Sequence, residues 1–177
     1  MKKVLFAIAL LSSVMANAQT WIGGSIGLDF VKPDYQGAKT ITTFSIAPEF
    51  GYSCSDKFDV AISLSESFIN YNGETANNIT VEPYARWTFA NSDKVSFFLE
   101  GGFGVGYAEY VDDAVLEDSQ VEFHIGFRPG VKFEMSDKVG LVAKLGFIGY
   151  QKVEDTYDAF GFNVNNNSLS LGMYYNF

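Results

Sequence analysis

The chain has 177 residues, of which 47% are hydrophobic, with 21 acidic and 12 basic side chains. The length suits a single domain, and the acidic excess argues against nucleic acid as a partner, since phosphate neutralisation needs clustered Lys and Arg. Cys54 is the single cysteine, which excludes an intramolecular disulfide and a metal site built from cysteines.

Residues 1–18 have the pattern of a secretory signal peptide. Lys2-Lys3 forms a short basic start, Val4 to Leu11 is an apolar run, and Ala16-Asn17-Ala18 supplies small residues at the cleavage positions. The apolar run is too short to cross a bilayer as a helix, which needs ~20 residues. We therefore expect a mature domain of residues 19–177, with 10 basic against 21 acidic side chains and a net charge of −11.

One tripeptide recurs along the mature chain. Ser-Asp-Lys occurs at 55–57, 92–94 and 136–138, at spacings of 37 and 44 residues. The mature start lies 36 residues before the first copy, and the chain ends 41 residues after the start of the last. Four units of similar length predict an eight-stranded meander, in which each unit is an up-strand, a long loop and a down-strand. Each tripeptide would then be a short hairpin turn on the periplasmic side.

The phase of the strands can be read from these turns. If each tripeptide is a three-residue turn, Cys54 faces Phe58, Asn91 faces Val95 and Met135 faces Val139. Apolar side chains then share one face of every expected strand, and a slip of one residue would turn these faces inside out. The sixth and seventh strands give the apolar sets Val121, Phe123, Ile125, Phe127, Pro129, Val131, Phe133 and Met135, and Leu141, Ala143, Leu145 and Phe147.

The opposite face of the strands is polar, small and charged. An eight-stranded barrel has an interior only wide enough for side chains to fill, and unpaired buried charges would cost several kcal/mol each. We therefore predict a packed ion-pair network in the lumen and no open pore, with Arg86 opposite Glu100 on neighbouring strands. The network residues are Glu49, Glu82, Arg86, Glu100, Glu122, His124, Arg128, Lys132, Glu134 and Lys144.

The last expected strand alternates strictly, with apolar side chains at the odd positions from Leu169 to Phe177. Its ending, Tyr175-x-Phe177, resembles the assembly signal of outer-membrane β-barrels. With the signal peptide and the four hairpin units, the whole mature chain resembles the outer-membrane β-barrel or porin-like family. In architecture it is similar to the eight-stranded transmembrane domain of outer-membrane protein A.

This resemblance implies an all-β protein, an eight-stranded antiparallel transmembrane meander β-barrel in the cell outer membrane of a Gram-negative organism. The apolar face would point outward into lipid. The implied partners are outer-membrane lipid, lipopolysaccharide and the barrel-assembly machinery, with Tyr175 and Phe177 as the assembly signal. The resemblance specifies fold and location well and specifies activity poorly.

A secreted lipocalin is the soluble alternative, since it also has eight strands and about this length. Its barrel needs the inverse arrangement, with apolar side chains inside. The Phe177 ending, the charges crowded on one strand face and the lack of a Gly-x-Trp motif near the start of the barrel favour the membrane barrel.

Residues that could carry catalysis are few. His124 is the single histidine and is expected to point inward between Glu122 and Arg128. As a general base oriented by Glu122, it would suit a lipid-modifying enzyme such as the lipid A deacylases and palmitoyltransferases, which are eight-stranded barrels. No Ser partner is evident, so we interpret His124 as part of the lumenal network.

Two further patterns could suggest ligand sites. The run from Gly101 to Gly106 lacks the spacing of a phosphate-binding loop and has no helix after it, and the acidic outer loops lack the spacing of a calcium loop. The sequence thus predicts no catalytic residue, cofactor or metal. It favours a structural role or loop-mediated interaction with an unidentified ligand, with a lipid-modifying enzyme or a narrow porin-like channel as the alternatives.

Overall fold

The computed structural model describes residues 19–31, 40–71, 73–108, 111–112, 115–116, 120–154, 157–163 and 169–177. The expected signal peptide, residues 1–18, lies outside these ranges. None of the described residues belongs to a helix long and apolar enough to cross a membrane.

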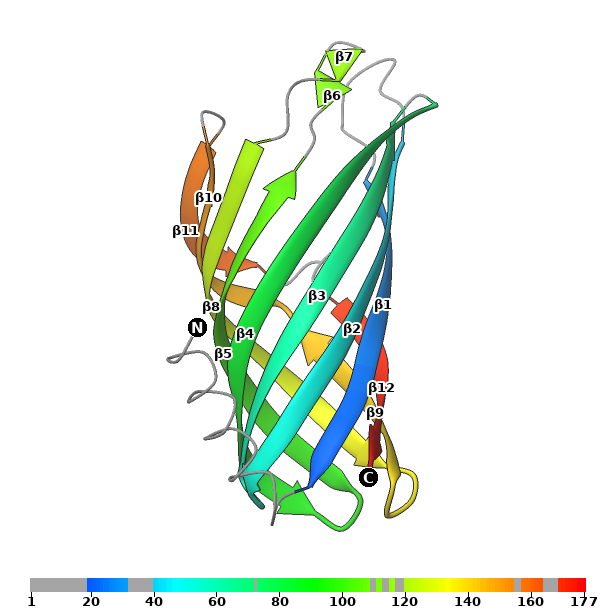
Figure 1. Cartoon of the computed structure of the whole chain (residues 1–177), viewed down its shortest axis with the longest axis vertical. Helices are drawn as coiled ribbons and strands as arrows, with labels where there is room; N and C mark the ends of the chain where they lie inside the picture. The colour runs from blue at the N-terminus through cyan, green and yellow to red at the C-terminus, as the bar shows by residue number, and fades with distance from the viewer. Residues whose placement is uncertain are drawn as a thin grey trace, which may run out of the picture.

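The chain forms an antiparallel sheet in which successive strands are neighbours (Figure 1). Six strands are continuous: β1 (Thr20–Val31), β2 (Ile41–Ser55), β3 (Phe58–Tyr71), β4 (Glu74–Ser92), β5 (Val95–Ala108) and β8 (Gln120–Glu134). The seventh consists of β9 (Val139–Leu145) and β10 (Phe147–Val153), and the eighth of β11 (Tyr157–Asn163) and β12 (Leu169–Asn176). The short β6 (Val111–Asp112) pairs with β7 (Val115–Leu116) outside the sheet.

The sheet closes on itself. β12 pairs with β1 on one side and with β9 on the other, and β8 pairs with both β9 and β10. Counting β9 with β10 and β11 with β12 as single strands, the protein is a closed eight-stranded barrel. The connections β2–β3, β4–β5 and β8–β9 lie at the same end as the carboxy terminus (Figure 1), and we call this end the short-turn rim.

The predicted outward faces are confirmed for most of the barrel. Leu28, Phe103 and Leu171 are 61%, 47% and 58% exposed, although they lie in the middle of strands. Their neighbours at odd spacing point inward, so the apolar face surrounds the barrel and the polar face lines the lumen. A barrel of this polarity places its apolar residues against lipid, which is the reverse of a lipocalin.

Two of the three predicted turns are wrong by one residue. Ser55 pairs with Phe58 and Ser92 with Val95, so only Asp-Lys forms each turn, and the Ser55 hydroxyl accepts a 3.4 Å bond from the Lys57 N–H. An extra residue then shifts the register near Cys54 and near Phe89. These β-bulges restore the predicted pairing farther along the strands. At the third turn Met135 faces Val139 as predicted, with a backbone bond of 2.9 Å.

The seventh strand contains the second correction. Phe147 was predicted to face outward, but it faces inward, because Gly146 interrupts the strand with a φ of +72°. Lys144 pairs with Gly130 and Ile148 with Phe127, so the seventh strand has one residue more than β8 over this interval. A glycine in this left-handed conformation is the usual first residue of one class of β-bulge. The bulge turns Phe147 into the lumen and Ile148 toward lipid.

Candidate functional site

The lumen holds two groups of charged side chains. The first, which we call the lower layer, joins Glu49 of β2, Arg86 of β4, Glu100 of β5 and Lys144 of β9, all 9% exposed or less. Arg86 lies opposite Glu100 and donates to its Oε1 from Nε at 3.0 Å and from Nη2 at 2.7 Å. Lys144 Nζ lies 2.5 Å from Glu49 Oε1 and 3.2 Å from Glu100 Oε2. The layer therefore forms one chain of ion pairs across the barrel.

Aromatic side chains complete the lower layer. The Arg86 Cζ lies 5.0 Å from the ring centroid of Trp21 and 4.7 Å from that of Phe98. A guanidinium between two ring faces gains cation–π attraction that increases when water is excluded. The Tyr84 hydroxyl donates to Glu49 Oε2 at 2.8 Å. The arginine is thus held by packing as well as by charge.

The inward direction of Trp21 and Phe98 is not evident from strand alternation alone. The signal lay in the glycines that face them across the strands. A Cβ on Gly51 would overlap the Trp21 ring, and one on Gly130 would overlap the Phe98 ring. Glycines on the polar face of the strands therefore mark positions where a large neighbour crosses the lumen.

The second group, which we call the upper layer, joins Glu82 of β4 to Glu122, His124 and Arg128 of β8. Arg128 donates to Glu82, and His124 Nε2 lies 3.1 Å from the other oxygen of that carboxylate. His124 Nδ1 lies 3.7 Å from Glu122 Oε1. Glu122 accepts a 2.5 Å bond from the amide of Asn78.

Phe147 packs against the upper layer. Its ring meets the imidazole of His124 edge to face, with centroids 5.8 Å apart, and lies 5.2 Å from the Arg128 Cζ. A Cβ on Gly104 would overlap the imidazole from the other side. The described contacts of His124 are therefore with carboxylates, a guanidinium and an aromatic ring, and they include no hydroxyl nucleophile.

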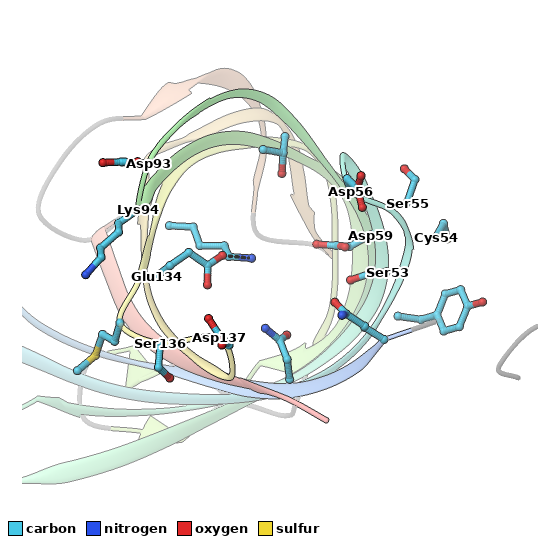
Figure 2. Close-up of a pocket in the computed structure, with 16 residues that line it drawn as sticks. Ser53, Cys54, Ser55, Asp56, Asp59, Asp93, Lys94, Glu134, Ser136 and Asp137 are labelled. Atoms are coloured by element: carbon cyan, nitrogen blue, oxygen red, sulfur yellow. Dashed lines mark ion pairs between the residues drawn. The ribbon is translucent and has the colours of Figure 1, made fainter. Parts of the chain in front are cut away.

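The last two predicted network residues lie nearer the short-turn rim. Lys132 pairs with Glu134 at 2.9 Å, and its Nζ lies 4.5 Å from the ring centroid of Tyr174. They line a polar cavity of about 1030 Å³, which we call the vestibule. Figure 2 shows Asp59 and Glu134 pointing into it from opposite sides of the barrel. Asp59 lies 4.0 Å from Arg86, so the lower layer borders the inner end of the vestibule.

The ten residues predicted for the lumenal network pair with one another inside the barrel. Six of the ten predicted network residues are buried. Eight of the ten form ion pairs between Lys or Arg and a carboxylate, and the other two, Glu122 and His124, lie 3.7 Å apart and form an ion pair when the imidazole is protonated. Within the described ranges, no group of three or more His, Cys, Asp or Glu side chains is placed to hold a metal ion. Cys54 is exposed, on the β2 side of the first turn.

The proposed assembly signal lies at the short-turn rim. Phe177 is 63% exposed, its ring contacts Tyr175 edge to face at 5.4 Å, and its N–H donates to the Thr20 carbonyl at 3.1 Å. The aromatic rings therefore face outward, where an assembly factor or lipid could contact them.

Deleting Phe177 should reduce the amount of folded protein in the outer membrane, because the deletion removes the terminal aromatic ring and the bond to Thr20. Folded protein would be measured as the fraction that migrates faster in gels when unheated than when boiled. Phe160→Ala, at another exposed aromatic residue, is the control and should leave that fraction unchanged. Assembly at the wild-type rate without Phe177 would contradict the signal role.

The chain is similar to known proteins over most of its length. The family model described as "Outer membrane protein beta-barrel domain" matches residues 4–177. The crystal structure of Neisserial surface protein A is 16% identical with a TM-score of 0.61, covering 90% of this chain and 97% of that one. The amino-terminal barrel of Pseudomonas aeruginosa OprF is 13% identical with a TM-score of 0.57, covering 91% of this chain and 100% of that one. Ail, the attachment invasion locus protein of Yersinia pestis, is 17% identical with a TM-score of 0.57, covering 90% of this chain and 99% of that one. Among curated proteins, no match was found.

Proposed function

This chain belongs to the outer membrane protein β-barrel domain family, and from that premise we propose that it is a closed, non-catalytic barrel whose filled lumen makes a rigid support for its outer loops. The loops would carry any recognition, since loops on a rigid scaffold are where binding residues concentrate. Lipopolysaccharide and the barrel-assembly machinery are the partners that we propose in addition to membrane lipid.

The lower layer carries this proposal. Arg86 and Glu100 are 3% and 2% exposed, and the aromatic rings of Trp21 and Phe98 pack on the guanidinium. A void beside this layer has a volume of about 10 Å³, room for about one water molecule at most. Opening a continuous water path would require separating buried ion pairs, which costs several kcal/mol for each uncompensated charge. A closed lumen is therefore the favoured state.

The two other functional hypotheses have less support. A narrow channel would need an open path through the lower layer. A lipid-modifying enzyme would need a nucleophile or an activated water next to His124. The described contacts of His124 are instead with Glu82, Glu122, Arg128 and Phe147. His124 serves in our proposal as a partner for two carboxylates.

Protein reconstituted in planar bilayers should therefore give no large, steady conductance, because the lower layer blocks the path from the vestibule. A known porin in the same bilayers would serve as the positive control. In cells that produce the protein, lipid A should have the same mass with His124→Ala as with the wild type. A large stable conductance would favour the channel, and a His124-dependent change in lipid A mass would favour the enzyme.

A further inference from the structure

The three Ser-Asp-Lys turns share a backbone contact that the turn geometry alone does not require. The carbonyl of each turn lysine accepts a hydrogen bond from the strand beyond its own hairpin. Thr88 N donates to Lys57 O, Glu134 N to Lys94 O, and Asn176 N to Lys138 O, each at 2.8 Å. Each lysine is thus attached to β4, β8 or β12 at the membrane edge.

The donor residue in each contact lies between two outward-facing apolar side chains. These flanking pairs are Trp87 and Phe89, Phe133 and Met135, and Tyr175 and Phe177, with exposed fractions from 39% to 63%. The structure therefore repeats one unit three times around the rim, a lysine beside a pair of lipid-facing side chains. Five of the six side chains in the three pairs are aromatic.

The ammonium groups of these lysines are available to a ligand. Lys57, Lys94 and Lys138 are exposed, and within the described part of the chain none of them forms an ion pair with a carboxylate. Lys138 Nζ lies 3.4 Å from the Tyr175 hydroxyl and 5.6 Å from the centroid of its ring. Lys138 thus extends along the outer side of the rim, beside Tyr175. Lys94 is among the residues that line the vestibule (Figure 2).

The aspartates of the same tripeptides, Asp56, Asp93 and Asp137, line the vestibule, as Lys94 does. The start of β1 provides an internal contrast. Gln19 precedes β1 as the lysines precede β3, β5 and β9, and its carbonyl accepts a 3.0 Å bond from Ser53 N, but its side chain is neutral.

We propose that Lys57, Lys94 and Lys138 each bind the phosphate of an anionic phospholipid in the periplasmic leaflet, with the adjacent lipid-facing pair packing on the glycerol and upper acyl chain. The proposal rests on the membrane barrel of the proposed function and on the orientation expected from the sequence, in which short turns face the periplasm. A lysine near an anionic lipid surface gains about 1 kcal/mol, roughly a fivefold preference for that lipid. Tyr and Trp rings favour the same depth in a bilayer.

Trp87 makes the first of these sites directly measurable. The chain has two tryptophans, and Trp21 is only 3% exposed in the lumen, whereas Trp87 is 52% exposed beside Lys57. The protein would be reconstituted in phosphatidylcholine bilayers that contain a small fraction of brominated phosphatidylglycerol or brominated phosphatidylcholine. Bromine quenches tryptophan on contact, so the ratio of the two quenching efficiencies reports the lipid preference at Trp87.

We expect the brominated anionic lipid to quench Trp87 with a roughly fivefold higher apparent affinity. Lys57→Gln should remove the preference, and Lys152→Gln, which removes an exposed lysine near the opposite end of the barrel, should keep it. High salt should weaken the preference by screening. Inorganic phosphate at matched ionic strength should not compete, because the flanking pair recognises the lipid body.

Equal quenching by both lipids in the wild type would overturn the proposal, as would a preference that survives Lys57→Gln or is removed by inorganic phosphate. Heat-modifiable gel mobility in the same samples shows whether the barrel is folded in the bilayer. Quenching by brominated phosphatidylcholine separately tests whether Trp87 faces lipid. A failed lipid preference is therefore distinguishable from a failed membrane barrel. Moving the reporter with Trp87→Phe and Phe133→Trp allows the same measurement with Lys94→Gln.

Discussion

Replacing Arg86 or Glu100 with alanine should each lower the free energy of unfolding by roughly 3–5 kcal/mol, because each change leaves a buried partner without its closest counter-charge. Arg86 would retain only Glu49 and Asp59, at 3.9 and 4.0 Å. Glu100 would retain Lys144 at 3.2 Å. The double variant should cost much less than the sum of the single variants, since Glu49 and Lys144 still pair with each other.

The measurement is urea unfolding of the reconstituted protein, with gel mobility as the readout of the folded barrel. Lys152→Ala is the matched control, because this exposed lysine lies opposite Asp158 at the far end of the barrel. We expect it to change the free energy of unfolding by no more than about 0.5 kcal/mol. If the effects of Arg86→Ala and Glu100→Ala are additive, the pair is not coupled and the proposed closed lumen loses its main support.

Phe98→Ala should destabilise the barrel by roughly 3–5 kcal/mol, the usual range for a fully buried aromatic residue. Phe98 is 0% exposed, and its ring lies 4.7 Å from the Arg86 Cζ. The substitution would leave a cavity in the lower layer and would remove one of the two aromatic rings that pack on the Arg86 guanidinium. Both effects act on the lower layer.

Phe97→Ala is the matched control, since Phe97 is the adjacent residue on β5 and is 46% exposed toward lipid. Lipid can fill the space that Phe97 vacates, so this change loses transfer free energy but leaves no cavity. We expect a clearly smaller loss, measured in the same urea titration. Equal losses for the two variants would contradict the inward and outward assignment of β5.

The strand faces could be predicted from sequence because alternation of period two is a local property of the chain. Leu28, Phe103 and Leu171 lie where the pattern placed them. The turns were harder to predict from the sequence. A two-residue turn followed by a bulge gives the same register beyond the bulge as a three-residue turn without one. The predicted pairing of Arg86 with Glu100 is therefore right, although the predicted pairing of Asn91 with Val95, next to the turn, is wrong.

The candidate site was predictable only in its charges. An inward carboxylate or guanidinium stands out on a strand because burying it has a cost, so Glu49, Arg86 and Glu100 were recognisable as lumenal. Trp21 and Phe98 were not, because an aromatic residue suits either the lipid face or the lumen. An aromatic side chain can point into the lumen where a glycine on the neighbouring strand leaves room for its ring. Which glycine faces it is known only once the strands are paired.

By itself, the sequence determined that the chain is an all-β barrel with an apolar outside and a charged inside, because both properties follow from alternation and from the four repeated units. The tertiary structure decided which charges meet. Glu49 and Lys144 are 95 residues apart and touch only because the sheet closes. It also decided that Phe147 faces the lumen, since one left-handed glycine reverses the phase of the strand after it. Closure and bulges act between strands, whereas alternation acts within one.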